Sequence, residues 1–220
     1  IRENEFEMAY PHTGVGFKVR GVSNLYVSMY SETIDETNPT YVGVIVDEDT
    51  SKIAIEEGRK NYKIAQFPST DSKEHVVKII KLTEAQVGNL VIDGMHVTAM
   101  TDDFNVSPVD LAPMCIEFIG NSITCGYGNE DSTNHVGFLS EHQNAMKTYA
   151  DIVARHYRAE CCLTAYSGRG LLRNFSGDSF GTIPEIYERC LPDDASSSYS
   201  FNDAYTPNLV VINVGTNDFS

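Results

Sequence analysis

The first half of the chain carries short hydrophobic segments in which apolar and polar residues alternate. This two-residue period is typical of β-strands that bury one face of a sheet. The segments are rich in Val, Ile and Tyr, and runs of turn-forming residues separate them. The pattern predicts a β-sandwich, specifically a jelly roll. Its strands are expected near residues 15–21, 24–32, 40–49, 59–67, 74–84 and 88–97, with a further strand within 47–58.

The pattern changes after Pro113, where the apolar residues gather into nearly continuous runs. Such runs are typical of parallel strands that are covered on both faces. They lie at residues 114–120, 161–168 and 208–218. Segments that predict helices alternate with these strands, at residues 141–157 and 183–190. Strands that alternate with helices predict a doubly wound α/β/α sheet.

These two patterns predict two domains. Residues 1–105 form the β-sandwich domain, and residues 114–220 form the α/β domain. Residues 106–113 are expected to be the linker, because the stretch around them holds two prolines and little apolar periodicity.

Each of the three predicted parallel strands ends in glycine and polar residues. Ligands of an open parallel sheet bind at the carboxyl ends of its strands, so these clusters are expected to meet at one edge. Ser122 follows the first strand, Gly168 the second and Asn217 the third. A serine hydroxyl, a glycine N–H without a side chain in the way and a carboxamide are the groups that acyl transfer requires.

Taken singly, each cluster has a plainer interpretation. A serine that follows a glycine at a strand end is usually a turn or helix-capping residue. The segment Ser167–Gly170 is by itself a turn, and so is the segment Gly215–Asp218. Their occurrence at the ends of three successive strands is what favours a catalytic site.

The charge and the cysteine content limit which partners and cofactors the protein is expected to bind. The chain has 220 residues and a formal net charge of -15. A surface this acidic repels phosphate groups, so neither nucleic acid nor an anionic membrane is an expected partner. No apolar run approaches the roughly 20 residues of a membrane helix. The five cysteines lack metal-ligand spacing, and the serine chemistry needs no metal or cofactor, so none is expected.

Three motifs resemble the first sequence blocks of the SGNH (GDSL-type) hydrolase superfamily. They are IGNSIT at 119–124, YSGRG at 166–170 and VGTND at 214–218. With their flanking residues, and with the segment 74–88, they are similar to carbohydrate esterase family two. The resemblance implies a serine esterase that removes O-acetyl groups from xylan or mannan through an acetyl-enzyme at Ser122. It also implies that the N–H groups of Ser122 and Gly168 and the amide of Asn217 form the oxyanion hole.

Two features depart from the superfamily pattern. The residue before the serine is often Asp in the superfamily and here is Asn121, which keeps a hydrogen bond without the charge. No Asp-x-x-His block, which should carry the catalytic histidine, follows Asn217. Three parallel strands are also fewer than such a sheet usually has. We therefore expect the α/β domain to be incomplete, with its histidine and further strands beyond Ser220 as a C-terminal remainder of the polypeptide.

Two other functions fit the same sequence. The first is a carbohydrate-binding or inactive module, in which tyrosines such as Tyr127 and Tyr166 hold sugars in place of the missing Trp. The second is an SGNH lipase or thioesterase. An acetylated polysaccharide or oligosaccharide is the expected partner, and secretion or a periplasmic location follows only from that substrate.

Overall fold

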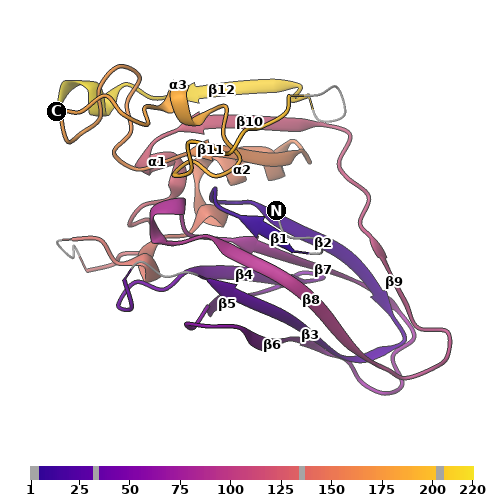
Figure 1. The fold of residues 1–220 in the computed structure, drawn as a ribbon. Helices are drawn as coiled ribbons and strands as arrows, with labels where there is room; N and C mark the ends of the chain where they lie inside the picture. The colour runs from indigo at the N-terminus through magenta and orange to yellow at the C-terminus, as the bar shows by residue number, and fades with distance from the viewer. Residues whose placement is uncertain (1–4, 32–34, 134–136, 202–205) are drawn as a thin grey trace.

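The computed structural model describes residues 5–31, 35–133, 137–201 and 206–220. Two antiparallel sheets form the lower part of the molecule in Figure 1. The four-stranded sheet has the order β1 (Phe6–Met8), β8 (Leu90–Ala99), β3 (Val22–Ser31) and β6 (Lys60–Gln66). The five-stranded sheet has the order β5 (Asp49–Ala54), β4 (Tyr41–Val46), β7 (Glu74–Lys81), β2 (Gly14–Arg20) and β9 (Asn105–Pro108).

One hydrophobic core fills the space between these sheets. It takes Leu25, Val27 and Met29 from the first sheet, and Val44 and Ile79 from the second. The alternation in β3 places every second residue in this core, as the sequence pattern predicts. The sandwich therefore forms because two half-apolar faces cover each other. The more specific jelly-roll topology stays a prediction.

Strand β9 occupies part of the stretch that the sequence predicts as a linker. Residues 105–108 pair with Phe17–Arg20 of β2, so the sandwich gains an edge strand where periodicity is weak. This short strand is held by its backbone pairing, and its side chains are mostly exposed. Strand β1 was likewise not expected from the sequence. The boundaries 1–105, 106–113 and 114–220 stay a proposal.

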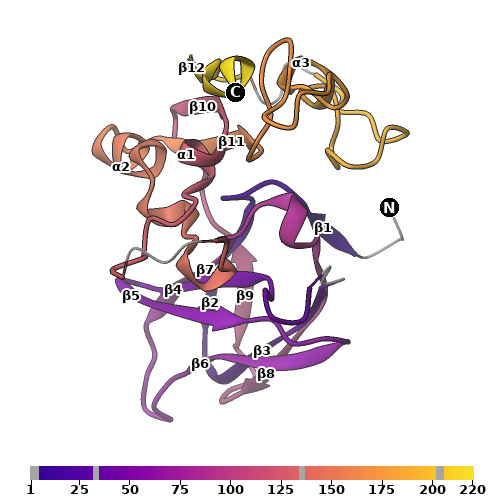
Figure 2. The same cartoon turned by 90° about the vertical axis from the view of Figure 1, so that its left-hand side faces the viewer.

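A three-stranded parallel sheet lies above the sandwich (Figures 1 and 2). Its order is β11 (Glu160–Ala165), β10 (Cys115–Gly120) and β12 (Leu209–Asn213), as the three apolar runs predict. In register, Gly120 lies between Ala165 and Asn213, so the three carboxyl ends meet at one edge. Within the described residues, β12 pairs only with β10, and several of its apolar side chains are exposed.

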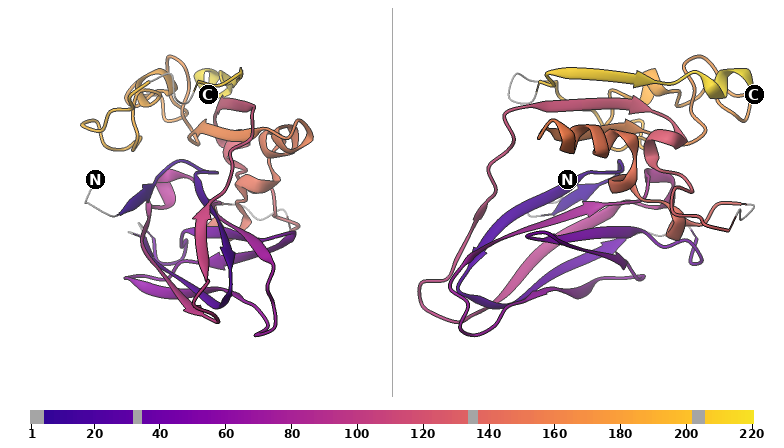
Figure 3. Two further views of the ribbon diagram at one scale, coloured as in Figure 1. Left: turned by 90° about the vertical axis from the view of Figure 1, so that its right-hand side faces the viewer. Right: turned by 180° about the vertical axis from the view of Figure 1, so that it is seen from behind.

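Helices cover both faces of this sheet. Ile116 and Phe118 of β10 pack against Ala150 and Ala154 of α2 (Tyr149–His156). Ile119, which points to the other face, packs near α3 (Ile183–Ile186). The views in Figure 3 show α2 between the parallel sheet and the sandwich. This is a sheet-rich α/β arrangement with helices on opposite faces.

The helix predicted over 141–157 is shorter than the sequence pattern indicates. Short 3-10 turns, η2 (Ser140–His142) and η3 (Ala145–Lys147), precede α2. The side chain of Thr148 accepts a hydrogen bond from the N–H of Asp151 at 3.3 Å, which makes Thr148 the N-cap. The backbone is extended at Gln143, between the two turns, and again at Thr148, directly before α2, so the helix does not include the earlier residues.

The sandwich and the parallel sheet share an interface. Ala9 and Ala85 of the sandwich region pack with Ile119 and Tyr166 in one cluster. Glu84, directly before η1 (Ala85–Val87), accepts a hydrogen bond from the backbone N–H of Ser167 in the α/β layer. The two layers are therefore packed together at the edge where the strand-end clusters lie.

Candidate active site

A tight turn at the end of β10 leads into Ser122. A Cβ atom at Gly120 would lie 1.9 Å from Oγ1 of Thr124, so only glycine fits where the chain enters α1 (Ser122–Cys125). The side chain of the buried Asn121 then accepts a hydrogen bond from the N–H of Ile123 at 3.2 Å. Asn121 therefore caps this turn, which is a role that an uncharged amide can fill.

Ser122 is half-buried at the first position of α1. Its backbone carbonyl accepts from the N–H of Tyr127 at 3.0 Å. Within the described residues its hydroxyl has no hydrogen-bond partner, so it is not used as a cap. The plainer interpretation of Ser122, a capping residue, thus applies to its neighbour Asn121 instead.

Gly168 lies in the turn after β11 with a φ of +76°, a conformation that favours glycine. Its carbonyl accepts from the N–H of Phe175 at 2.8 Å, which closes the following loop. In the part of the chain that is described, its own N–H has no acceptor. A side chain at this position would add backbone strain, so the turn favours glycine.

Asn217 is buried and links the third cluster to the second. Its Nδ2 donates to the carbonyl oxygen of Arg169 at 2.7 Å, and a second amide hydrogen remains. The next residue, Asp218, accepts from the N–H groups of Leu171 at 2.9 Å and Leu172 at 2.6 Å. These backbone N–H groups hold the pKa of Asp218 below its usual range. The loop after β11 is therefore fastened to the end of β12.

The structure thus brings the three predicted clusters to one edge of the parallel sheet. Direct contacts join the clusters of Gly168 and Asn217, and the register of β10 places the cluster of Ser122 between their strands. The convergence of their three donor groups on one oxygen atom stays a prediction. Asp218 is a residue that the sequence reasoning missed, although it closes the same motif as Asn217.

A cavity of about 390 Å³ opens beside Gly168. Ser167 and Tyr127 line it from the α/β layer, and Gln86 and Val87 line it from the sandwich. Tyr127 is exposed, and its ring lies 5.0 Å from that of Phe138. Tyr166, the other tyrosine proposed for sugars, is instead buried in the core with its hydroxyl on Asp193.

A fully buried carboxylate, that of Glu84, lies beneath this site. It accepts from the N–H of Ser167 at 2.7 Å and from the hydroxyl of Ser167 at 2.5 Å. Gln143 donates to the same carboxylate at 3.1 Å and accepts from the backbone N–H of Glu84 at 3.2 Å. Gln143 also donates to the carbonyl of Cys125, at the end of α1, at 3.3 Å. A residue of the sandwich therefore fixes both the loop before Gly168 and the turn that begins at Ser122.

Two other buried groups surround Glu84. Lys81 is fully buried, and its ammonium donates to the carbonyls of Thr83 at 2.7 Å and Glu84 at 3.0 Å. Burial lowers the pKa of Lys81 to about 7, although the charge of Glu84 opposes this shift. Burial raises the pKa of the Cys125 thiol well above its usual value, so this thiol is not activated. The alternation in β7 could have indicated that Lys81 is buried, because Lys81 lies on the same inward face as Val77 and Ile79.

The described histidines have other places in the fold. His12 lies 2.9 Å from Asp151, and His75 lies 2.8 Å from Asp47. His96 lies on the sandwich, and His156 is exposed on α2. His142 lies 3.9 Å from Asp131. His135 lies outside the described residues.

The described residues contain no metal-binding group of three or more His, Cys, Asp or Glu side chains. In the same part of the chain, no helix is both long and apolar enough to cross a membrane.

Comparisons with known proteins agree with the motifs. The family model for the carbohydrate esterase 2 N-terminal region matches residues 2–103. The chain is 37% identical over 150 residues to the cellulase/esterase CelE of Acetivibrio thermocellus, which covers 66% of this chain and 17% of CelE. It is 28% identical over 216 residues to an acetylxylan esterase / glucomannan deacetylase of Cellvibrio japonicus. That alignment covers 96% of this chain and 56% of the relative. The chain thus spans about half the length of the second relative.

The fold has a solved counterpart. A family two carbohydrate esterase from Clostridium thermocellum, in complex with cellohexaose, superposes with a TM-score of 0.86 at 28% identity. The superposition covers 99% of this chain and 63% of that one. The likeness therefore includes the sandwich, the parallel sheet and the edge between them.

Replacing Glu84 by Gln tests the buried carboxylate. Gln has one acceptor oxygen where Glu84 serves four donors, including the Cys125 thiol, so at least one donor loses its partner. We expect the free energy of unfolding to fall by about 1–3 kcal/mol in urea titrations. Glu57→Gln makes the same chemical change at an exposed position and should leave stability unaltered. Equal stability of the two variants would contradict the assigned role of Glu84.

Lys81 predicts a specific pH dependence. Its pKa is about 7 in the folded protein and about 10.4 in an unfolded chain. Between these values the unfolded state binds more protons, so the buried lysine destabilises less as pH rises. The stability of wild type relative to Lys81→Met should therefore increase from about pH 7 to about pH 10. Urea unfolding across this range measures it, with Lys63→Met as the exposed control. A constant difference for Lys81→Met would count against the shifted pKa.

Proposed function

The chain belongs to the family two carbohydrate esterases, and we propose that it is a carboxylic ester hydrolase that removes O-acetyl groups from plant cell-wall polysaccharide. The observation that carries the proposal is the hydroxyl of Ser122, which has no hydrogen-bond partner among the described residues and lies at the edge where the loops of Gly168 and Asn217 are joined. Serine is a weak nucleophile without a base, so this hydroxyl needs a partner that accepts its proton.

In the proposed mechanism, Oγ of Ser122 attacks the acetyl carbonyl carbon while the base takes the hydroxyl proton. The negative charge on the carbonyl oxygen is stabilised by the N–H groups of Ser122 and Gly168 and by the second amide hydrogen of Asn217. The sugar hydroxyl leaves with the proton, and an acetyl-enzyme remains at Ser122. In the second half of the reaction the base takes a proton from water, and the water oxygen attacks the acetyl carbon. Acetate is released as Ser122 regains its proton.

The base is proposed to be the histidine of the Asp-x-x-His block, beyond Ser220. Two observations support this proposal. His12 and His75 already pair with carboxylates at other places, and the relatives are longer than this chain.

The substrate is proposed to be acetylated xylan or mannan. The Cellvibrio relative is an acetylxylan esterase / glucomannan deacetylase, and the clostridial structure holds cellohexaose. A neutral polysaccharide also suits a chain of net charge -15. The exposed ring of Tyr127 in the cavity offers a surface for a sugar ring. Because such polymers lie outside the cell, we propose a secreted or periplasmic location.

Ser122→Ala tests the nucleophile. Without its Oγ no acetyl-enzyme forms, so acetate release from acetylated xylan or glucomannan should fall to the background rate, while thermal unfolding is unchanged. Ser132→Ala, an exposed serine in the following loop, should retain full activity. Retained activity of Ser122→Ala would refute the assignment. Sugar binding without any hydrolysis by wild type would favour a binding module, and faster release of butyrate than of acetate would favour a lipase.

Asn217→Ala tests the oxyanion hole. Loss of one donor should lower kcat roughly 10²-fold with a smaller effect on KM. Asn213→Ala removes an exposed amide from the same strand end and should have wild-type kinetics. An unchanged kcat in Asn217→Ala would limit this residue to its bond with Arg169.

A further inference from the structure

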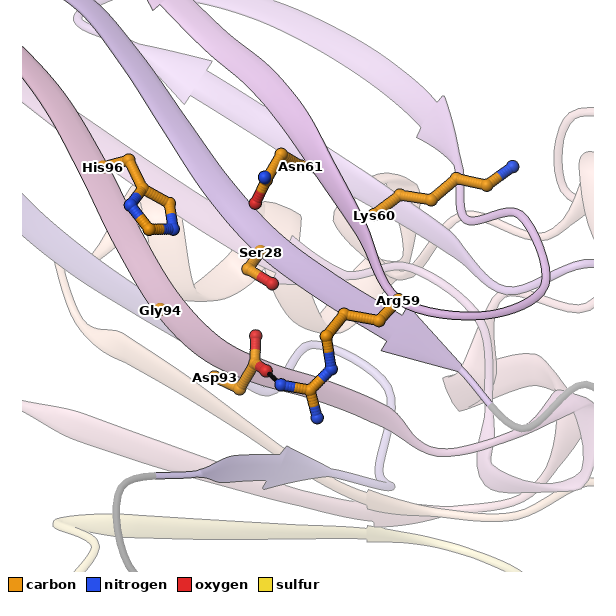
Figure 4. A pocket seen from close by; sticks show the side chains of 7 residues that line it. All are labelled: Ser28, Arg59, Lys60, Asn61, Asp93, Gly94 and His96. Atoms are coloured by element: carbon orange, nitrogen blue, oxygen red, sulfur yellow. Dashed lines mark ion pairs between the residues drawn. The ribbon is translucent and has the colours of Figure 1, made fainter.

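A second cavity, of about 380 Å³, lies on the outer face of the four-stranded sheet (Figure 4). Its lining residues come from β3, from β8 and from β6 with the residue before it. They are Ser28, Arg59, Lys60, Asn61, Asp93, Gly94 and His96. None of them lines the cavity beside Gly168. This outer-sheet pocket is therefore separate from the candidate active site.

The register of the sheet creates the hollow. Ser28 on β3 lies directly opposite Asn61 on β6 and Gly94 on β8. Ser28, with its small side chain, and Gly94, which has none, therefore lie side by side in the middle of the sheet face. His96 lies two residues further along β8. Between Ser28 and Met29 the register shifts, so Asp93 has no partner in the ladder. This irregularity lets Asp93 lie at the pocket.

The carboxylate of Asp93 is left half-satisfied. Its side chain is 6% exposed, and its Oδ2 forms an ion pair with Arg59. Its Oδ1 is buried and has no hydrogen-bond partner among the described residues. Figure 4 shows one oxygen turned toward Arg59 and the other toward Ser28. A buried acceptor without a donor is costly, which points to a ligand that donates a hydrogen bond there.

The charges of the pocket select the kind of ligand. Arg59 repels a cation, and Asp93 repels an anion, as does the net charge of -15. Lys60 is directed away from the hollow and pairs with Glu56. Ser28, Asn61 and His96 can each donate and accept hydrogen bonds, and no large apolar side chain lines the pocket. Neutral hydroxyl groups satisfy such a surface best.

We propose that the outer-sheet pocket is a second binding site, for a neutral sugar unit of an oligosaccharide. A sugar hydroxyl donates to Oδ1 of Asp93 and others bond to Asn61 and Arg59. The site lies outside the proposed catalytic groups, so it adds polymer binding without taking part in ester cleavage. Two sites on one chain raise the effective concentration of polymer at each.

Residue-resolved NMR titration tests this proposal. Unacetylated xylohexaose, mannohexaose and cellohexaose are added in turn to the 220-residue protein, and backbone amide shifts are followed. We expect saturable shifts at Ser28, Asn61 and Gly94 with at least one of them. No shift at these residues with any of the three sugars would overturn the proposal. Shifts there with calcium chloride or inorganic phosphate, and none with sugar, would overturn it as well.

Gly94→Val provides the matched variant. A Cβ atom there would meet only Ser28 and His96, each at 3.8 Å, so a side chain fits and fills the hollow. We expect at least tenfold weaker sugar binding at this pocket, while shifts at Gly168 persist. Asn61→Ala is a second variant at an exposed position, in case Gly94→Val fails to fold. Thr98→Val, on the same strand and outside the pocket, should bind as wild type.

The titration does not depend on ester hydrolysis. In the full-length protein, which would include the proposed histidine, acetate release from p-nitrophenyl acetate should be the same in Gly94→Val and wild type, because none of the proposed catalytic groups lines the pocket. If wild type shows no sugar shifts at this pocket but releases acetate, this proposal fails and the proposed function stands. If it shows those shifts but releases no acetate, the proposed function fails and this proposal stands. Undiminished sugar binding in a folded Gly94→Val variant would overturn it.

Discussion

The candidate site depends on one buried carboxylate. Glu84 belongs to the sandwich, yet its oxygens accept hydrogen bonds from Ser167 and Gln143 of the α/β layer. A buried charge is tolerated only when its hydrogen bonds are satisfied, so the loops around it have little freedom. Gln143 carries the connection to the end of the turn that starts at Ser122. The sandwich is therefore part of the framework of the site as well as a neighbour of it.

The sandwich has two regions whose buried polar groups are satisfied differently. The edge near Glu84 and η1 faces the α/β layer and helps to line the cavity beside Gly168. The outer face of the four-stranded sheet is hollowed where Ser28 and Gly94 adjoin. At the edge near Glu84, buried polar groups satisfy one another. In the outer-sheet pocket, one oxygen of Asp93 has no hydrogen-bond partner among the described residues. That difference separates a structural network from a pocket that can take a ligand.

Periodicity predicted most of the elements, because strand and helix patterns are local. The strands of the sandwich and the three parallel strands lie where the apolar residues indicate. Periodicity failed where other contacts decide the backbone. Strand β9 is held by pairing with β2, and α2 begins only at Tyr149, after the extended backbone of its N-cap Thr148.

By itself, the sequence determined the strand-end clusters and the residue types of Ser122, Gly168 and Asn217, since glycine turns and apolar runs are written in neighbouring residues. Only the tertiary structure decided which distant groups meet them. Glu84 lies 83 residues from Ser167 along the chain, and nothing local marks it as buried. The physical reason is that a hydrogen bond between layers depends on how the sheets pack, whereas a turn depends on adjoining residues alone.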